Sequence, residues 1–297
     1  MADHFGGEWT KIKLDSLRKY LNAYLTIFRT AIKARNFKIL YIDAFAGNGE
    51  NIFTADDNSL ELSLFSPEEK RNEYPGSARI ALELDKKFDK YIFIELEPEN
   101  CSKLKSLISA VNIEGSDVEV IQGDSNIELR NILAQYDWRR YRAVLFLDPF
   151  GMQVDFATLK SIAKTRAIDV WLLVPLGVGV MRLLKNNGQI SEANKATLTR
   201  FFGCDDWYNE LYKAGISDTL FGEEEFVQKT VNFQNLIKYY GSRLGEIFGG
   251  ISPDPLLLKN SRGNTIFALY FMVANQDEKV KHLAINIANS IIKKKHG

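Results

Sequence analysis

The feature that most constrains the fold of this chain is a regular alternation of short strand-like runs with helical ones. Five runs rich in β-branched and aromatic residues are separated by stretches with helical spacing. Such alternation is typical of a parallel sheet with helices on both faces. It predicts one domain over 1–297 with a Rossmann-like, doubly wound, mostly parallel α/β sheet. The expected strands are 37–43, 90–95, 117–122, 142–147 and 169–174.

Four segments fall outside this alternation. An amphipathic helix is expected at 8–36, where apolar residues recur every three or four positions. The polar stretch 51–75 separates the first strand from its helix and is predicted to be an inserted loop or lid. The region 186–248 is predicted to be a helical elaboration, with 223–248 as one long helix. The segment 251–297 is predicted to form an antiparallel hairpin and a closing helix.

Composition narrows the class of protein. The 297 residues have a net charge of zero, so no global field attracts nucleic acid or anionic lipid. Two cysteines do not make a disulfide scaffold, and the His and Cys residues lack the spacing of metal ligands. No stretch reaches the roughly 20 apolar residues that span a bilayer, and the first residues lack the apolar core of a signal peptide. We expect a cytoplasmic protein with no membrane or metal partner.

Acidic residues stand at the ends of four successive expected strands. They are Asp43, Glu95, Asp124 and Asp148. One such acid is unremarkable, because aspartate is common in turns and at helix N-caps. Parallel strands bring their carboxyl ends to one edge, however, where ligands bind in folds of this class. The four acids together therefore predict a ligand site at this edge.

The turn after the first strand indicates the kind of ligand. Gly47 and Gly49 form G-x-G, without the full phosphate cradle of dinucleotide folds. A site lined by acids disfavours a triphosphate and suits S-adenosylmethionine, which carries an ammonium and a sulfonium, better than NAD or ATP. Asp43 would face the ammonium group, Glu95 the ribose hydroxyls and Asp124 the adenine amine. The remaining candidate cofactor contacts are Ala44, Phe45, Ser125 and Asp148.

The tetrapeptide Asp148-Pro149-Phe150-Gly151 is the sharpest local motif. A carboxylate at a strand end can accept hydrogen bonds from an exocyclic amine, and an adjacent aromatic ring can stack on a base. Asp148, Pro149 and Phe150 are therefore the candidate catalytic residues. The alternative is a strand that simply ends at Asp-Pro, with Phe150 capping the core.

A set of basic residues lies on one arc of the N-terminal helix. At about 100° per residue, these residues cluster away from the apolar stripe. They could bind nucleic-acid phosphates, or form only the solvated face of an amphipathic helix. The residues are Lys11, Arg18, Arg29 and Lys33.

Five segments in this order resemble the three-Cys-motif partner protein (TcmP) family. They are "YIDAFAGNGE", "GSARIALE", "YIFIELEPEN", "VIQGDSN" and "VLFLDPFGM". The resemblance implies a class I S-adenosylmethionine-dependent methyltransferase fold over 9–174, and a partner protein that carries the three cysteines. Residues 148–151 resemble the Asp-Pro-Pro-Tyr motif of amino-methyltransferases and, more closely, the Asp-Pro-Phe-Gly of tRNA guanine-N2 dimethyltransferases. The departure from Asp-Pro-Pro-Tyr disfavours the N6 atom of adenine as the methylated atom.

The leading interpretation is a methyltransferase that acts on an exocyclic amine of a nucleic-acid base, in tRNA or DNA. One alternative is a binding module without turnover that works with a partner protein. Another is a methyltransferase for a protein or a small molecule, with the 51–75 insertion as its lid.

Overall fold

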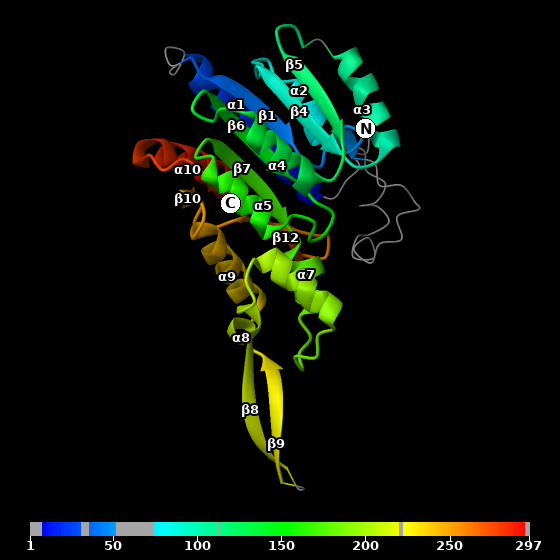
Figure 1. Ribbon diagram of the computed structural model, residues 1–297, viewed down its shortest axis with the longest axis vertical. Coiled ribbons are helices and arrows are strands. Elements are labelled where there is room, and N and C mark those ends of the chain that lie inside the picture. Colours follow the sequence, from blue (N-terminus) through cyan, green and yellow to red (C-terminus); the bar gives the residue numbers. More distant parts are fainter. Residues whose placement is uncertain (1–7, 31–35, 52–73, 112, 220–221, 295–297) are drawn as a thin grey trace.

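A computed structural model describes residues 8–30, 36–51, 74–111, 113–219 and 222–294. Its centre is an eight-stranded sheet in the order β10-β12-β7-β6-β1-β4-β5, with β11 also paired to β12 (Figure 1). Strands β1, β4, β5, β6 and β7 are all parallel. Their bounds are Lys38–Asp43, Lys90–Glu95, Asp117–Gln122, Tyr141–Leu147 and Ile168–Val174.

The strand order reverses at β1. From β1 the chain moves outward through β4 to β5, and then returns to the other side of β1 to form β6 and β7. This reversal is the switch point of a doubly wound sheet, where the two sets of loops diverge and leave a crevice for ligands. The predicted Rossmann-like fold is therefore confirmed.

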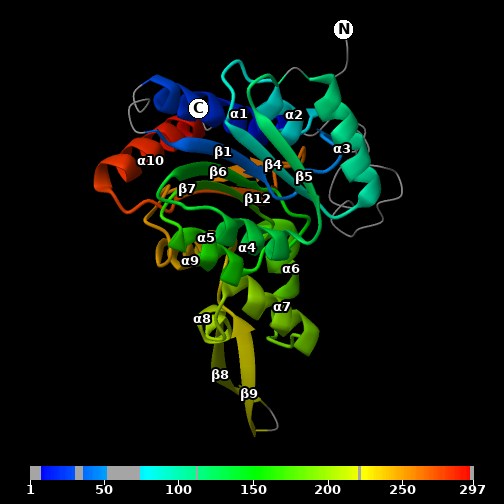
Figure 2. The same cartoon turned by 45° about the horizontal axis from the view of Figure 1, so that its top comes forward.

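Helices cover both faces of the sheet (Figures 1 and 2). Every residue of β1 after Lys38 is buried, as a strand covered on both sides requires. One face packs against α1 (Glu8–Thr30), α2 (Ser77–Leu82), α3 (Pro98–Ala110) and α10 (Glu278–Lys293). The other packs against α4 (Ser125–Gln135), α5 (Phe156–Lys164), α7 (Glu192–Phe202) and α9 (Phe233–Gly245).

The predicted C-terminal hairpin and helix are confirmed. Strand β12 (Thr265–Val273) runs antiparallel to β7, and β11 (Leu256–Lys259) pairs with it across the expected turn. The short strand β10 (Gly250–Ile251) pairs with the other end of β12. The predicted N-terminal helix begins at Glu8, and residues 31–35 of it lie outside the described part of the chain.

The prediction of a helical region over 186–248 is wrong in its middle. A π-helix (Leu176–Val180) and α6 (Met181–Leu183) follow β7, and helices α7, α8 (Trp207–Leu211) and α9 do form. Between α8 and α9, however, β8 (Tyr212–Thr219) and β9 (Gly222–Lys229) make an antiparallel ribbon that projects from the body (Figure 1).

The single long helix expected at 223–248 is therefore replaced by a strand and a shorter helix. Asn232 ends the extended segment, because its side chain accepts the Asn235 amide and caps α9 at 2.8 Å. Within the ribbon, the Phe226 ring covers Gly215 on the opposite strand: a β-carbon there would lie 2.7 Å from the ring. A glycine paired with an aromatic residue on the neighbouring strand is a cross-strand interaction, which the helical periodicity of the sequence does not reveal.

The predicted insertion 51–75 lies mostly outside the described residues. Its two ends, β2 (Glu50–Asn51) and β3 (Tyr74–Pro75), pair antiparallel, and the Gly76 amide donates to the Gly49 carbonyl at 2.9 Å. The chain thus returns to the loop after β1 before α2 begins. Its role as a lid stays a prediction.

Candidate functional site

The loop that follows β1 lies across the switch point of the sheet. The Ala44 amide donates to the Phe146 carbonyl of β6 at 3.1 Å, and the Ala46 amide donates to the Ile94 carbonyl of β4 at 3.0 Å. Residues 43–49, which we call the β1 loop, are therefore fixed to the strands on both sides of β1. This is the edge at which the sequence predicts a ligand site.

The β1 loop also hydrogen-bonds to the end of β4 and to the residues after β5, and it lies within reach of the charge of Asp148 after β6. Its Gly47 amide donates to a carboxylate oxygen of Glu95 at 2.9 Å. Its Ala44 carbonyl accepts a hydrogen bond from the Ser125 hydroxyl. The charge of Asp148 acts on Asp43. The structure thus brings together most of the predicted cofactor contacts around one loop.

Asp43 is completely buried. Its carboxylate accepts the Tyr41 hydroxyl and the Phe45 amide, both at 3.3 Å, and is hydrogen-bonded to Ser77 at the start of α2. Burial, the largest cause, and the charge of Asp148 together raise the pKa of Asp43 from 3.8 to about 7, against the lowering effect of these hydrogen bonds. An ionised carboxyl group in such a buried position destabilises the fold. Acidic residues with strongly shifted pKa values are characteristic of functional sites.

Asp148 forms an ion pair with Lys13, which sequence analysis did not identify. Lys13 comes from the first turns of α1, and its side chain is only 4% exposed, against 17% for Asp148. The missed signal lies in the helical spacing. Trp9, Lys13, Leu17 and Leu21 occur every four residues, so Lys13 occupies an apolar position of α1 where a lysine needs a partner.

Phe150 does not cap the core. Pro149 is buried, but Phe150 is 70% exposed, and its amide is held by the Gln153 side chain at 3.0 Å. The alternative in which Phe150 closes the hydrophobic core is therefore wrong. An exposed aromatic ring two residues after Asp148 is available to stack on a planar group.

Two more exposed apolar side chains follow the neighbouring strands. Leu96 comes after Glu95 and is 58% exposed, and Ile127 lies in the first turn of α4 and is 51% exposed. Together with Phe150 they place one large apolar group after each of β4, β5 and β6. Such groups beside polar ones are typical of a site that encloses a flat, partly apolar ligand.

Glu95 and Asp124 have structural partners of their own. Glu95 accepts the amides of Gly47 and Glu97, each at 2.9 Å, and the Asn100 side chain at 3.3 Å. Since a carboxylate has about four acceptor positions, a ribose that uses two would displace the long bond from Asn100. Asp124 caps α4, accepting the amides of Asn126 and Ile127 with one oxygen at 2.9 and 3.1 Å.

The two glycines of the β1 loop serve different purposes. Both have positive φ, +58° at Gly47 and +84° at Gly49, a region that other residues avoid. A β-carbon at Gly49 would lie 3.0 Å from Leu107, so this glycine lets α3 approach. A β-carbon at Gly47 would have no neighbour within 4 Å, so the space beside this glycine is open.

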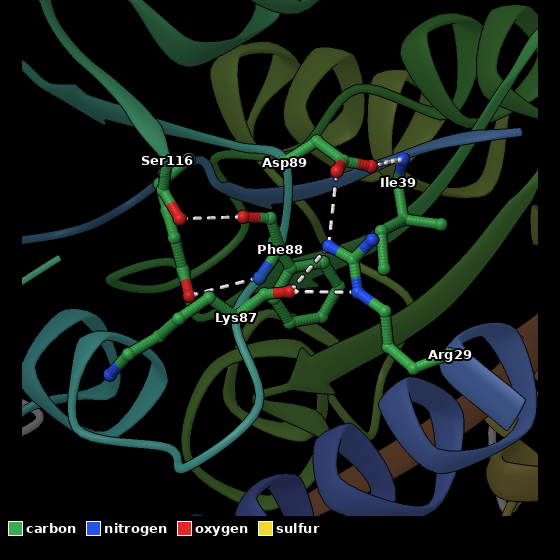
Figure 3. Close-up of polar contacts among 7 residues, drawn as sticks. Arg29, Ile39, Lys87, Phe88, Asp89 and Ser116 are labelled. Carbon is green, nitrogen blue, oxygen red and sulfur yellow. Dashed lines mark hydrogen bonds and ion pairs between the residues drawn. The ribbon is translucent and has the colours of Figure 1, made fainter. Parts of the chain in front are cut away.

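The predicted basic residues do not form one patch at the site. Helix α1 runs antiparallel to the strands, so that Trp9 packs near the carboxyl ends of the sheet against Phe267. Arg29 lies at the opposite edge, donating to the Lys87 carbonyl at 2.7 Å and to Asp89 at 3.0 Å (Figure 3). Lys11 and Arg18 are exposed, and Lys33 lies outside the described residues.

Asp89 also accepts the Ile39 amide at 2.6 Å, so Arg29 helps to fix the turn before β4 to the start of β1 (Figure 3). The structure therefore gives Arg29 a role in the fold. Binding of nucleic acid by Lys11, Arg18, Arg29 and Lys33 stays a prediction.

Other kinds of site find less support in the structure. A hollow of about 640 Å³ lies between α2 and α3, beside Asn48, Arg79 and Lys103. Neither Asp43 nor Asp148 lines it, and we assign no ligand to it. Within the described ranges, no group of three or more His, Cys, Asp or Glu side chains could hold a metal ion. None of the helices described is long and apolar enough to cross a membrane.

The fold defines a Rossmann-like α/β protein, and the candidate ligand site lies at the switch point of its sheet. No family model matches the sequence, and no curated protein matches it. The resemblance to the three-Cys-motif partner proteins therefore stays a prediction.

Similar solved structures show low sequence identity. A protein from Legionella pneumophila is 14% identical with a TM-score of 0.38, over 78% of this chain and 91% of that protein. Trm1 from Pyrococcus horikoshii, in complex with S-adenosyl-L-methionine, is 12% identical with a TM-score of 0.35, over 94% of this chain and 74% of Trm1. TM-scores below 0.5 carry no functional weight, so the proposals below rest on the geometry of this chain.

Proposed function

We propose that the protein is an S-adenosylmethionine-dependent methyltransferase that acts on an exocyclic amine of a nucleic-acid base. The observation that carries this proposal is the pair Asp43 and Asp148, which stand at the ends of the neighbouring strands β1 and β6 at the switch point. Asp43 is fully buried, whereas the Asp148 side chain is 17% exposed and comes two residues before the exposed Phe150. A site for a cationic cofactor next to a site for a planar amine accounts for both.

The residues present fit S-adenosylmethionine. The space beside Gly47 is open, and the buried Asp43 is the first residue of the same loop. Asp43 would bind the ammonium group of the cofactor, Glu95 a ribose hydroxyl, and the free oxygen of Asp124 the adenine amine. Leu96 and Ile127 would cover the apolar faces of the adenine. This assignment gives the ammonium group, a ribose hydroxyl and the adenine amine of the cofactor each a polar partner in the chain.

When bound, the cofactor would supply a methyl group on a positively charged sulfur, which becomes a neutral thioether as a nitrogen lone pair takes the methyl. Asp148 would accept a hydrogen bond from the substrate amine and so orient its lone pair. Phe150 would stack on the ring that carries this amine. The methylated nitrogen then releases one proton to water. In this scheme the chain contributes alignment and exclusion of water, without a covalent intermediate.

A partner protein and the nucleic acid remain part of the proposal. The exposed residues Lys11 and Arg18 would contact phosphates near the site, and a protein of the three-Cys type would complete the substrate surface. Salt dependence separates a nucleic-acid substrate from a small one, because affinity that rests on phosphate contacts falls steeply as salt rises.

Calorimetric titration with S-adenosylmethionine and S-adenosylhomocysteine tests the cofactor assignment. We expect saturable binding, weakened about tenfold by Glu95→Gln, which removes a charge-assisted hydrogen bond. Glu97→Gln is the matched control, since Glu97 is exposed two residues away and only its amide contacts Glu95. Binding should be unchanged in this control.

Transfer of a tritiated methyl group to tRNA, DNA and cell extract then tests the activity. Label on nucleic acid supports the proposal. Cofactor binding without transfer to any acceptor favours the binding-module alternative, and label only on protein or small molecules favours the other methyltransferase. Absence of cofactor binding to folded protein would overturn the proposed function.

A further inference from the structure

The first turns of α1 reach the carboxyl edge of the sheet and bring a buried cation to the site. Trp9 packs against Phe267, with ring centroids 5.0 Å apart. The Lys13 ammonium lies 5.2 Å from the centroid of the Trp9 ring and contacts the Oδ2 atom of Asp148. Lys13 is therefore held between an aromatic ring and the carboxylate that we assign to the substrate amine.

Within the ion pair, the lysine side chain is almost completely buried, whereas the aspartate side chain is partly exposed to solvent. The Lys13 side chain is 4% exposed, whereas that of Asp148 is 17% exposed. A purely structural pair would satisfy both oxygens inside the core, because burying part of a charge without partners is costly. The hydrogen bond from Lys13 uses Oδ2, which leaves Oδ1 as the acceptor for a ligand, two residues before the exposed Phe150.

The positive charge of Lys13 changes which ligand groups the Asp148 carboxylate attracts. Without Lys13, Asp148 and the buried Asp43 would present two neighbouring carboxylates to a ligand. With Lys13, the Lys13 and Asp148 side chains together carry no net charge. A neutral N–H group can still donate to Oδ1, but an ammonium group gains little attraction from a neutral pair.

We propose that Lys13 is a positioning residue that neutralises Asp148, so that the acceptor site takes a neutral amine, such as that of a nucleobase, instead of an ammonium ion. This inference rests on the proposed function and narrows its substrate class. It also matches the chemistry, since a protonated amine has no lone pair to accept a methyl group. An alkyl ammonium such as a lysine side chain is accordingly a poor substrate.

The test compares two ligands that differ by one positive charge, S-adenosylmethionine and S-adenosylhomocysteine. The ratio of their dissociation constants measures the electrostatic environment of the sulfur, and contacts shared by both ligands cancel. Calorimetry at about pH 8, where an unpaired carboxylate is ionised, gives this ratio. The proteins are wild type, Lys13→Met, Asp148→Asn, the double variant, and Lys19→Met as a matched control on the exposed side of α1.

We expect opposite shifts in the two single variants. Lys13→Met leaves an unpaired carboxylate and should favour the cationic S-adenosylmethionine by about tenfold. Asp148→Asn leaves an unpaired ammonium and should disfavour it by a similar factor. The double variant should return to within about twofold of the wild-type ratio, because both charges of the pair are then absent. Lys19→Met should also stay within about twofold, because this exposed charge is screened by solvent and salt.

The possible results are distinguishable. Failure of the folded wild type to bind either ligand overturns the proposed function itself. Binding by the wild type, with ratios that do not change or that move in the same direction in both single variants, overturns only the inference about Lys13. Circular dichroism confirms folding of each variant. If Lys13→Met does not fold, the ratio of dissociation constants in Asp148→Asn is compared with that in the double variant. The inference requires that removing Lys13 from Asp148→Asn restores the wild-type ratio.

Discussion

Asp43 should make the stability of this protein fall as the pH rises. The carboxyl group has a pKa of about 7 in the folded protein, against 3.8 when exposed. This difference of about 3 units, at 1.36 kcal/mol per unit, destabilises the ionised folded state by about 4 kcal/mol. Asp43 is completely buried, so solvent does not screen this penalty. Asp43→Asn removes the charge but keeps an oxygen that can accept from Tyr41 or Phe45.

The direction of the effect follows from which state holds the proton. Between about pH 4 and pH 7 the unfolded chain has lost the proton that the folded protein still binds, so the free energy of unfolding falls through this window. Above pH 7 the penalty is complete. Relative to wild type, Asp43→Asn should gain about 2 kcal/mol at pH 5 and about 4 kcal/mol at pH 8. The gain at pH 8 corresponds to an unfolding temperature about 6 °C higher.

Urea unfolding of both proteins at the two pH values measures this gain. Each comparison is made at a single pH, because burial also raises the pKa of Asp169 to about 7, and that group adds a similar slope to both proteins. Asp124→Asn is the control: Asp124 is an exposed N-cap, where asparagine serves equally well. A stability gap between Asp43→Asn and wild type that is the same at pH 5 and pH 8 would refute the reasoning.

Two further predictions concern the elements outside the site. Replacing residues 215–226 with Asn-Gly should shift the unfolding temperature by less than about 2 °C, because a two-stranded ribbon contributes little on its own; the base stays attached through Lys229, whose amide donates to Asn186. Calorimetry checks this, and a large loss of stability would show that the ribbon packs on the body. Arg29→Ala should lower the free energy of unfolding by about 1–2 kcal/mol through its lost hydrogen bonds, whereas Arg18→Ala should stay within about 0.5 kcal/mol. Urea unfolding compares the two, and equal effects would contradict the structural role of Arg29.

The parallel core could be predicted from the sequence because its inner strands are buried on both faces and even the partly buried edge strand β5 has the composition of a strand. Runs such as 90–95 and 117–122 are short, rich in β-branched or aromatic residues, and bounded by polar turn residues. The structure places strands at the same limits. The β8–β9 ribbon lacks this signal, because both of its faces are partly polar and its strongest cue is the pairing of Gly215 with Phe226 across two strands. Pairings of this kind appear only in three dimensions.

The sequence predicts the part of the site that depends only on the order of the strands in the chain. Topology alone requires that residues at the ends of β1, β4, β5 and β6 lie at one edge. Topology does not indicate that α1 brings Lys13 to this edge and Arg29 to the opposite one. Both lie on the same helix, and their different roles follow from its antiparallel course across the sheet.

The four acids at the strand ends are not equivalent as evidence for function. Asp124 caps α4 and Glu95 fixes the β1 loop, so the fold alone would retain both residues. Asp43 has no such explanation, because its burial destabilises the folded state and asparagine could keep part of its hydrogen bonding. Asp148 likewise needs a buried lysine beside it to be tolerated. A residue that destabilises the fold needs another reason for its presence, and binding of a ligand is such a reason. The case for a cofactor site therefore rests on Asp43 and Asp148 rather than on the number of acids.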